Sequence, residues 1–401
     1  MNPRVVGICL ILTTFVRCYT KTRIITKIID MFRISAKTGV ALLACALLLA
    51  GCSGGKTFKV KGVIQGAKNG VLYLQREENG RYVDVDSLEL GRNGRIELAG
   101  RAEEPQMYYL AFGKSEPALS FFADGAPVQV QAHIDSLDRA RITAGDEQAL
   151  YNEFMDYMRD FAARKEAVYL DILRSGAVDG AKDSLEIYRA MYEKLDRRQL
   201  QFVANFALSH PESRLSPLLA YTFLNKGYSP LLDTIAAKFT PEVAASRYGQ
   251  EFATFVSNAK NTLVGMSAPQ FELKTDSLTC RLEDFAGKNL FVVAWTAGDQ
   301  ANADYLTALK KVYEKWHPKG LEVLTSCIGG NDEDYRYDTY TLAMPWQDVR
   351  DARGVKSTLV EKFALTGTLP TGVLIGPDGI ILARYVSPEG LEVALDYLSK
   401  Q

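Results

Sequence analysis

The sequence predicts a multidomain α+β protein with an N-terminal antiparallel β-domain, a central helical region and a C-terminal α/β sandwich. Its 401 residues exceed what one compact core usually holds. Short alternating strands separated by Asn-Gly and Asp-Gly turns fill residues 58–145, and a helical period fills residues 146–263. Buried strands then alternate with amphipathic helices over residues 264–401. We therefore expect three folded units in that order.

The composition is that of an ordinary globular chain, with 24% charged residues, 47% hydrophobic residues and a formal net charge of −1. A charge so close to zero gives no general attraction to a polyanion, so we expect no nucleic-acid partner. His133, His210 and His317 each stand apart from other residues at metal-ligand spacing. We therefore expect no metal site and no cofactor.

The N-terminal residues contain two short apolar runs, and neither is long enough to cross a bilayer. The second run follows two basic residues and ends in Leu-Ala-Gly-Cys at residues 49–52. Residues 31–52 therefore resemble a bacterial lipoprotein signal. The resemblance implies cleavage before Cys52, which then carries the lipids and anchors the protein.

Acyl chains on Cys52 would hold the protein at the inner or outer membrane of a Gram-negative cell envelope without a spanning helix. No acidic run follows Cys52. By resemblance to lipoproteins exported through such a run, its absence favours a periplasm-facing position. Met31 stands directly at the signal, so we interpret residues 1–30 as an extension from a wrongly chosen start codon, and residues 53–57 as a linker.

The N-terminal unit is expected to be a small β-sandwich or barrel built as a meander of hairpins. Apolar and polar residues alternate in residues 58–64 and 82–88. Turn dipeptides separate the apolar runs. These dipeptides are Asn69-Gly70, Asn79-Gly80, Asn93-Gly94 and Asp124-Gly125.

The central region is expected to be several helices. Apolar residues recur at helical spacing from Leu150 to Phe161, with polar residues between them. Prolines divide the region and also suit a first helical turn. The predicted breaks are Ser209-His210-Pro211, Ser216-Pro217, Ser229-Pro230 and Thr240-Pro241.

The C-terminal unit alternates strands and helices. A continuous apolar run at residues 290–295 predicts a strand buried on both faces, and residues 304–316 follow as an amphipathic helix. The chain returns as a strand at residues 321–325. The later expected elements are strands at residues 371–375 and 379–384 around a Pro-Asp-Gly turn, and a closing helix at residues 388–400.

Residues 264–401 resemble the thioredoxin-like thiol:disulfide oxidoreductases and peroxiredoxin relatives of bacterial envelopes. The resemblance implies a thioredoxin-like α/β sandwich, and the whole chain resembles a lipoprotein type that joins an uncharacterised N-terminal β-domain to such a module. Its motifs follow the family's order. They are the first strand at residues 265–271, the loop at 282–288, the central strand at 291–296, the cis-proline loop at Leu369-Pro370-Thr371 and the turn at 375–379.

The chain departs from the family at the redox motif. Where the family has Trp-Ala-Ser-Trp-Cys-x-x-Cys, residues 295–302 read Trp-Thr-Ala-Gly-Asp-Gln-Ala-Asn. The two cysteine positions are therefore Asp299 and Asn302, and we expect no catalytic residue there. At a helix N-terminus Asp299 would accept a backbone N–H bond as an N-cap, but it cannot attack a disulfide.

Peptide binding is the function that this departure leaves possible. In this fold the loop before the cis-proline presents backbone groups to an extended chain, which needs no cysteine. By resemblance, Thr368, Leu369 and Pro370 would form that edge, opposite Asp299, and the partner would be a protein or peptide in the envelope. The competing interpretation is structural: the cis-proline is kept because the turn requires it.

A second hypothesis is oxidoreductase or antioxidant-type chemistry at Cys280 and Cys327. These thiols remain after the signal is removed, and neither occupies a helix-terminal position that would acidify it. Sequence leaves open whether they pair, and buried inert thiols are the simpler interpretation. The other cysteines are Cys9, Cys18, Cys45 and the anchor Cys52.

A third hypothesis places ligand binding in the N-terminal β-domain. Tyrosines on its strands could stack on a sugar or a peptide if their rings gather in an exposed groove. Half of any strand's aromatic residues face a core, so the alternative is simple packing. The candidate residues are Tyr73, Tyr82, Tyr108 and Tyr109.

Overall fold

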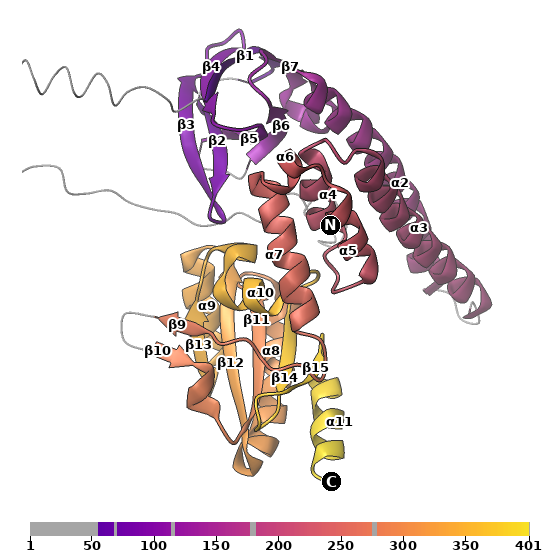
Figure 1. Ribbon diagram of the computed structural model, residues 1–401, viewed down its shortest axis with the longest axis vertical. Coiled ribbons are helices and arrows are strands. Elements are labelled where there is room, and N and C mark those ends of the chain that lie inside the picture. Colours follow the sequence, from indigo (N-terminus) through magenta and orange to yellow (C-terminus); the bar gives the residue numbers. More distant parts are fainter. Residues whose placement is uncertain (1–54, 68–69, 114–116, 177–181, 275–278, 401) are drawn as a thin grey trace, which may run out of the picture.

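The computed structural model describes residues 55–400 except 68–69, 114–116, 177–181 and 275–278. The predicted extension, signal segment and anchor Cys52 lie outside the described residues. Within them, the chain is a multidomain α+β protein: the β-domain lies at one end, the C-terminal α/β domain lies at the other, and the helices lie alongside both (Figure 1). The predicted fold class is confirmed. No helix of the described part is long and apolar enough to cross a membrane.

The β-domain contains two four-stranded sheets, ordered β4-β1-β7-β8 and β3-β2-β5-β6. Its elements are β1 (Lys56–Gln65), β2 (Val71–Glu78), β3 (Arg81–Glu89), β4 (Arg95–Ala102), β5 (Gln106–Phe112), β6 (Pro117–Ala123), β7 (Val128–His133), the 3₁₀ helix η2 (Ile134–Arg139) and β8 (Arg141–Thr143). Strand β1 thus begins two residues before the expected position.

Strand pairing differs from the predicted meander. The β2–β3 hairpin turns at Asn79 (φ 51°) and Gly80 (φ 78°), as its turn dipeptide predicts. Strand β1, however, pairs with β4 on one side and runs parallel to β7 on the other. The meander is wrong for this sheet because the chain crosses to the second sheet after β1 and returns with β4.

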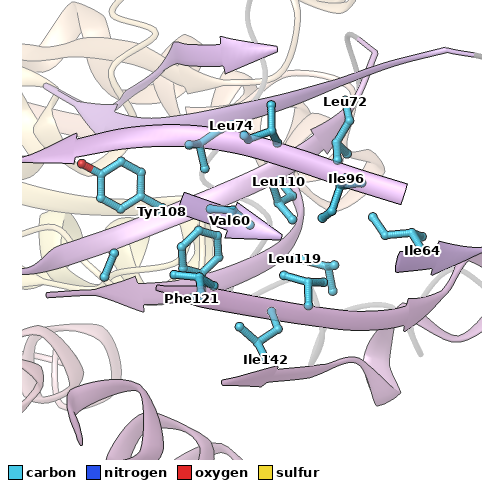
Figure 2. Packing of buried hydrophobic residues seen from close by; sticks show 14 of the residues in the cluster. Val60, Ile64, Leu72, Leu74, Ile96, Tyr108, Leu110, Leu119, Phe121 and Ile142 are labelled. Carbon is cyan, nitrogen blue, oxygen red and sulfur yellow. The ribbon is translucent and has the colours of Figure 1, made fainter. Parts of the chain in front are cut away.

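One core fills the space between the two sheets. Figure 2 shows inward side chains from both sheets meeting there, including Val60 of β1 and Leu74 of β2. Tyr108 and Phe121 are fully buried among them and stack with 6.1 Å between ring centroids. Residues of β4 are alternately exposed and buried along the whole strand, which is the expected pattern for a strand with one face toward solvent.

The central region consists of helices α2 (Asp146–Gly176), α3 (Lys182–Ser209), α4 (Leu215–Phe223), α5 (Pro230–Lys238), α6 (Pro241–Ala244) and α7 (Arg247–Asn261). Ser229 and Thr240 cap α5 and α6 with their hydroxyl oxygens, and a proline follows each cap. Pro217 falls inside the first turn of α4, so Ser216-Pro217 is no break: proline's missing N–H is tolerated in a first turn.

The C-terminal domain has a five-stranded mixed sheet in the order β13-β12-β11-β14-β15 and a small β10-β9 sheet. Strands β11, β12 and β13 are parallel, while β14 and β15 are antiparallel to their neighbours. The elements of the domain are β9 (Glu272–Lys274), β10 (Thr279–Arg281), η3 (Leu282–Phe285), β11 (Asn289–Thr296), α8 (Gln300–Trp316), η4 (His317–Lys319), β12 (Leu321–Gly329), α9 (Asp332–Leu342), β13 (Gln347–Arg350), η5 (Gly354–Lys356), α10 (Thr358–Phe363), β14 (Thr371–Ile375), β15 (Ile381–Arg384) and α11 (Pro388–Leu398).

Helices cover both faces of the five-stranded sheet. Val292 and Ala294 of β11 pack toward α10, whereas the alternating Val293 and Trp295 pack toward α8 and α11. Residues 265–271 do not form the expected strand: the segment begins in a turn at Gly265 (φ 89°) and has one bridge, between Ser267 and Ile380.

Packed cores join the helical region to both neighbours. One cluster unites Met107 and Phe122 of the β-domain with Phe154 and Tyr248 of the helices. Another places Ala364 of the C-terminal domain among α3, α4, α5 and α7. The backbone N–H of Met107 also donates to the Tyr248 hydroxyl at 2.9 Å.

Candidate functional site

The loop between β11 and α8 meets the proline loop at one end of the sheet. Strand β14 runs antiparallel to β11, and Ala294 pairs with Thr371. The Leu369-Pro370 peptide, which is cis, therefore stands beside the end of β11. This pairing places the residues that precede β14 next to the end of β11, from which the loop to α8 starts.

Asp299 is the N-cap of α8, which confirms the prediction from its position. Its Oδ1 accepts from the backbone N–H of Asn302 at 3.0 Å and from the Asn302 side-chain Nδ2 at 3.1 Å. Asn302 is 3% exposed, and its Oδ1 accepts from the backbone N–H of Thr296 at 2.9 Å. The two residues at the family's cysteine positions thus tie the loop to the helix by hydrogen bonds, and neither carries an electron-transferring atom.

Acidic side chains of α9 contact the same loop. The backbone N–H of Gly298 donates to Asp338 Oδ2 at 2.7 Å. Gly298 has φ 77°, and a β-carbon there would lie 2.7 Å from Asp334 Oδ2. Together with Asp299 these carboxylates surround the helix N-terminus with negative charge, which opposes the formation of any further anion there.

A buried polar network behind the loop was not foreseen from sequence. Asp348 Oδ1 accepts from Trp295 Nε1 at 2.8 Å and from the Thr325 hydroxyl at 2.5 Å. Its Oδ2 accepts from the Tyr335 hydroxyl at 2.8 Å. Burial raises the pKa of the Asp348 carboxyl above its usual range.

Helix α9 has a start signal in the sequence that could have identified it: Asn331 is followed by three acidic residues.

The structure keeps the two remaining thiols apart. Cys280 and Cys327 are free and buried, and they belong to core clusters on opposite faces of the sheet. Burial raises the pKa of Cys280 to about 11 and that of Cys327 to about 12, although Arg350 Nη1 lies 3.2 Å from the Cys327 sulfur. Neither thiol has the acidic, accessible setting of a redox nucleophile.

The proline loop offers backbone groups to solvent. Gly367 and Thr368 are exposed, while Leu369 and Pro370 are half-buried. Among the described residues, the backbone groups of Thr368 and Leu369 have no backbone partner. This edge has the unpaired N–H and C=O groups that strand addition requires.

The tyrosines of the β-domain do not form an exposed groove. Tyr108 is fully buried and donates to the Arg101 carbonyl at 2.9 Å, so its proposed surface role is wrong because it faces the core between the sheets. Tyr109 packs edge-on against Tyr82, with 4.7 Å between ring centroids, and also against the helical region. Tyr73 is half-buried on β2.

Among residues 55–400, excluding the undescribed gaps, no group of three or more His, Cys, Asp or Glu side chains is placed to hold a metal ion. The acids beside Gly298 are engaged with backbone or side-chain donors instead. Asp334 Oδ2, for example, accepts from the Asn331 side chain at 2.7 Å.

Comparison with known proteins gives one family match and several structural matches. Residues 58–151 match a family described as a domain of unknown function (DUF4369). No curated protein matches the chain.

Several solved structures match about a third of the chain. The thioredoxin domain of a thiol-disulfide oxidoreductase from Bacteroides vulgatus is 22% identical, covers 34% of this chain and 97% of its own length, and has a TM-score of 0.31. A thiol:disulfide interchange protein from Bacteroides sp. is 23% identical, with 35% and 93% covered and a TM-score of 0.31. A thiol-disulfide oxidoreductase from Bacteroides fragilis is 26% identical, with 33% and 98% covered and a TM-score of 0.30.

The fold assignment rests on the architecture described above: three parallel strands, an antiparallel hairpin, helices on both faces and a cis-proline before β14. The C-terminal domain of this chain therefore has a thioredoxin-like fold, and its two described cysteines, Cys280 and Cys327, are both free. By resemblance, Asp299 and Asn302 stand at the positions of the family's cysteine pair.

Proposed function

We propose that the protein is an envelope lipoprotein whose thioredoxin-like domain binds an extended protein or peptide segment without exchanging disulfides. One observation supports this most strongly: Asp299 and Asn302 are hydrogen-bonded to each other at the helix N-terminus where the family has its cysteines. The nucleophile is missing, whereas the neighbouring loop that meets a substrate chain in this fold is present.

Binding would use the proline loop as a strand edge. The exposed Thr368 and half-buried Leu369 carry backbone groups that have no backbone partner among the described residues. An incoming extended segment satisfies such groups through main-chain hydrogen bonds. The carboxylates beside Gly298 favour a segment with basic side chains over an acidic one.

The thiols do not support the oxidoreductase alternative. A thiolate is the reactive species in disulfide exchange, and a pKa of about 11 or 12 leaves little thiolate near neutral pH. Purified protein should therefore fail to reduce insulin disulfides or to consume peroxide. Turnover that Cys280→Ser or Cys327→Ser abolishes would refute the proposal.

Site-specific photo-crosslinking tests the binding edge. A photoreactive amino acid at Thr368 should yield a covalent adduct with an envelope protein in intact cells. The same amino acid at Tyr397, which is 65% exposed on α11, is the matched control and should yield none. Equal adducts at both positions, or none at Thr368, would count against a binding edge at the proline loop.

The anchor is tested separately. Cys52→Ser removes the proposed site of lipid attachment, so the protein should move from the membrane fraction to the soluble fraction of the envelope. Membrane association that persists at high salt after this substitution would contradict lipid anchoring through Cys52.

A further inference from the structure

The outer face of the β4-β1-β7-β8 sheet is exposed and basic. Sheet β3-β2-β5-β6 packs on the helices through Met107 and Phe122, so the first sheet forms the uncovered side of the sandwich. The outward basic residues of its four strands, all of which are described, are Lys59, Lys61, Arg95, Arg101 and Arg141. Glu97 is the one outward carboxylate of those strands.

Charge on this face is only partly neutralised. Glu97 lies 3.3 Å from the Lys59 ammonium and 3.2 Å from that of Lys61, and it cannot compensate both. Their side chains are 65% and 48% exposed. Asp86 of β3 accepts from the backbone N–H of Ala99 at the sheet edge. Even with Arg101 left aside, Lys59, Lys61, Arg95 and Arg141 outnumber Glu97 and Asp86, so the face is net positive although the whole chain has a charge of −1.

The face also contains a shallow hollow of about 500 Å³. Lys61, Arg95 and Gln131 are among its lining residues and so is the carboxylate Glu97, so two cations and an amide donor share this concave area with one acid. A phosphate headgroup matches such donors in charge and in hydrogen bonding.

The chain position of this face indicates its partner. The sequence places Cys52 four residues before Lys56, the first residue of β1. An extended link of that length spans at most about 14 Å. Lipid on Cys52 would therefore hold the sheet within one or two Debye lengths of a bilayer at physiological salt, where basic residues are attracted to anionic lipids.

We propose that this basic sheet face docks on the surface of an anionic phospholipid bilayer and orients the protein on the membrane. The thioredoxin-like domain lies at the other end of the molecule (Figure 1), so docking would hold that domain away from the lipid. The inference goes beyond the proposed peptide binding and uses the proposed anchor only as a reason for proximity.

The test uses residues 55–401, which contain all five core clusters and no lipid anchor, so that docking is measured alone. Flotation with phosphatidylcholine vesicles that contain phosphatidylglycerol should show binding, and pure phosphatidylcholine vesicles should show none. Binding should disappear between about 0.1 M and about 1 M salt, as the Debye length falls from about 10 Å to about 3 Å.

Substitutions then test whether the basic sheet face is the surface that binds the vesicles. The triple change Lys59→Gln, Lys61→Gln and Arg95→Gln should weaken vesicle binding about a hundredfold, from about fivefold for each side chain. Glu97→Gln should strengthen it, which a merely destabilised protein would not do. A control triple change removes equal charge from exposed positions elsewhere and should bind like the wild type. Its substitutions are Lys238→Gln, Lys311→Gln and Lys362→Gln.

Equal binding to neutral and anionic vesicles would overturn the proposal, as would an unchanged affinity of the first triple variant. Tighter binding to duplex DNA than to the anionic vesicles would also overturn it, because the face would then serve a nucleic acid. None of these outcomes depends on Cys52 or on the proline loop, so a failure here leaves the proposed function to its own tests.

Discussion

At the scale of single residues, Asp299 shows how one position can lose its chemistry and keep its structural value. Helix N-termini present free N–H groups and a positive dipole end, which stabilise a thiolate and a carboxylate alike. Asp299 accepts from the N–H of Asn302 in that field. The substitution therefore preserves the start of α8 while it removes the nucleophile.

Replacement of the cap should lower stability without creating activity. Asp299→Ala should reduce the free energy of unfolding by about 1 kcal/mol, because the N–H of Asn302 loses its acceptor. Asp299→Asn keeps an acceptor oxygen and should lose much less. Urea unfolding followed by circular dichroism measures both, and equal losses for the two variants would show that capping is not the role of Asp299.

The buried thiols should make stability depend on alkaline pH. A cysteine thiol in the unfolded chain has a pKa of about 8.5. In the folded protein, burial raises the pKa of Cys280 to about 11 and that of Cys327 to about 12. The folded state holds these protons longer, so their contribution to stability is complete below about pH 8.5 and is lost as pH rises.

We therefore expect the free energy of unfolding to fall more steeply in the wild type than in the double variant Cys280→Ala and Cys327→Ala. Above about pH 8.5, each thiol should lower the free energy of unfolding by up to about 1.4 kcal/mol per pH unit. Urea unfolding at a series of alkaline pH values measures the two slopes. Parallel curves would mean that the thiols already ionise in the folded protein.

At the scale of elements, helix α7 carries the charge contacts that join the three units. Arg247, in its first turn, lies 2.7 Å from Glu77 of β2 and 3.0 Å from Glu251 one turn later. Glu251 in turn lies 3.2 Å from Lys356 of the C-terminal domain. These side chains are mostly buried, so their pairing is less screened than an ion pair at the surface.

Loss of the Arg247 ion pairs should lower the free energy of unfolding. Arg247→Met keeps the aliphatic stem but leaves Glu77 without its cation and Glu251 with Lys356 alone, and should destabilise the protein by about 2 kcal/mol. The control Arg164→Met breaks the exposed pair with Asp160 and should cost less than about 0.5 kcal/mol. Urea unfolding compares the variants, and equal effects would show that α7 does not depend on this contact.

One helix beside the candidate site is not predicted from the sequence. Helix α9 (Asp332–Leu342) has no buried residue, so it lacks the apolar period by which the helix α8 (Gln300–Trp316) is recognised. Its acids reach the candidate site through Gly298, a contact between residues 298 and 338. The sequence of residues 295–302 does not indicate that contact.

At the scale of the whole molecule, the β2–β3 hairpin reaches from the β-domain to the thioredoxin-like domain. Gly80, at the hairpin tip, has φ 78°, and a β-carbon there would lie 2.0 Å from the Arg353 carbonyl oxygen. The backbones of the two terminal domains therefore touch at a residue that only glycine can fill without movement.

A matched pair of glycine substitutions isolates this contact. Gly80→Ala and Gly379→Ala both place a side chain at a φ near 80°, but nothing lies within 4 Å of a β-carbon at Gly379. The control should lose about 1 kcal/mol from backbone strain alone. Gly80→Ala should lose more and should also increase hydrogen exchange around Arg353. Equal losses with unchanged exchange would show that the hairpin does not secure the C-terminal domain.

The sequence by itself determined the features that short-range chemistry controls. The order of the three units follows from the change of hydrophobic period, and the Asn79-Gly80 turn follows from its dipeptide. The Asp299 cap and the missing cysteine pair follow from the resemblance of residues 264–401 to the thioredoxin-like family. Only the tertiary structure decided that β1 runs parallel to β7 and that Cys280 and Cys327 lie on opposite faces of a sheet. It also decided that acidic side chains of α9 contact the candidate site. These are contacts between residues distant in sequence, and local patterns do not encode which distant segments will pack together.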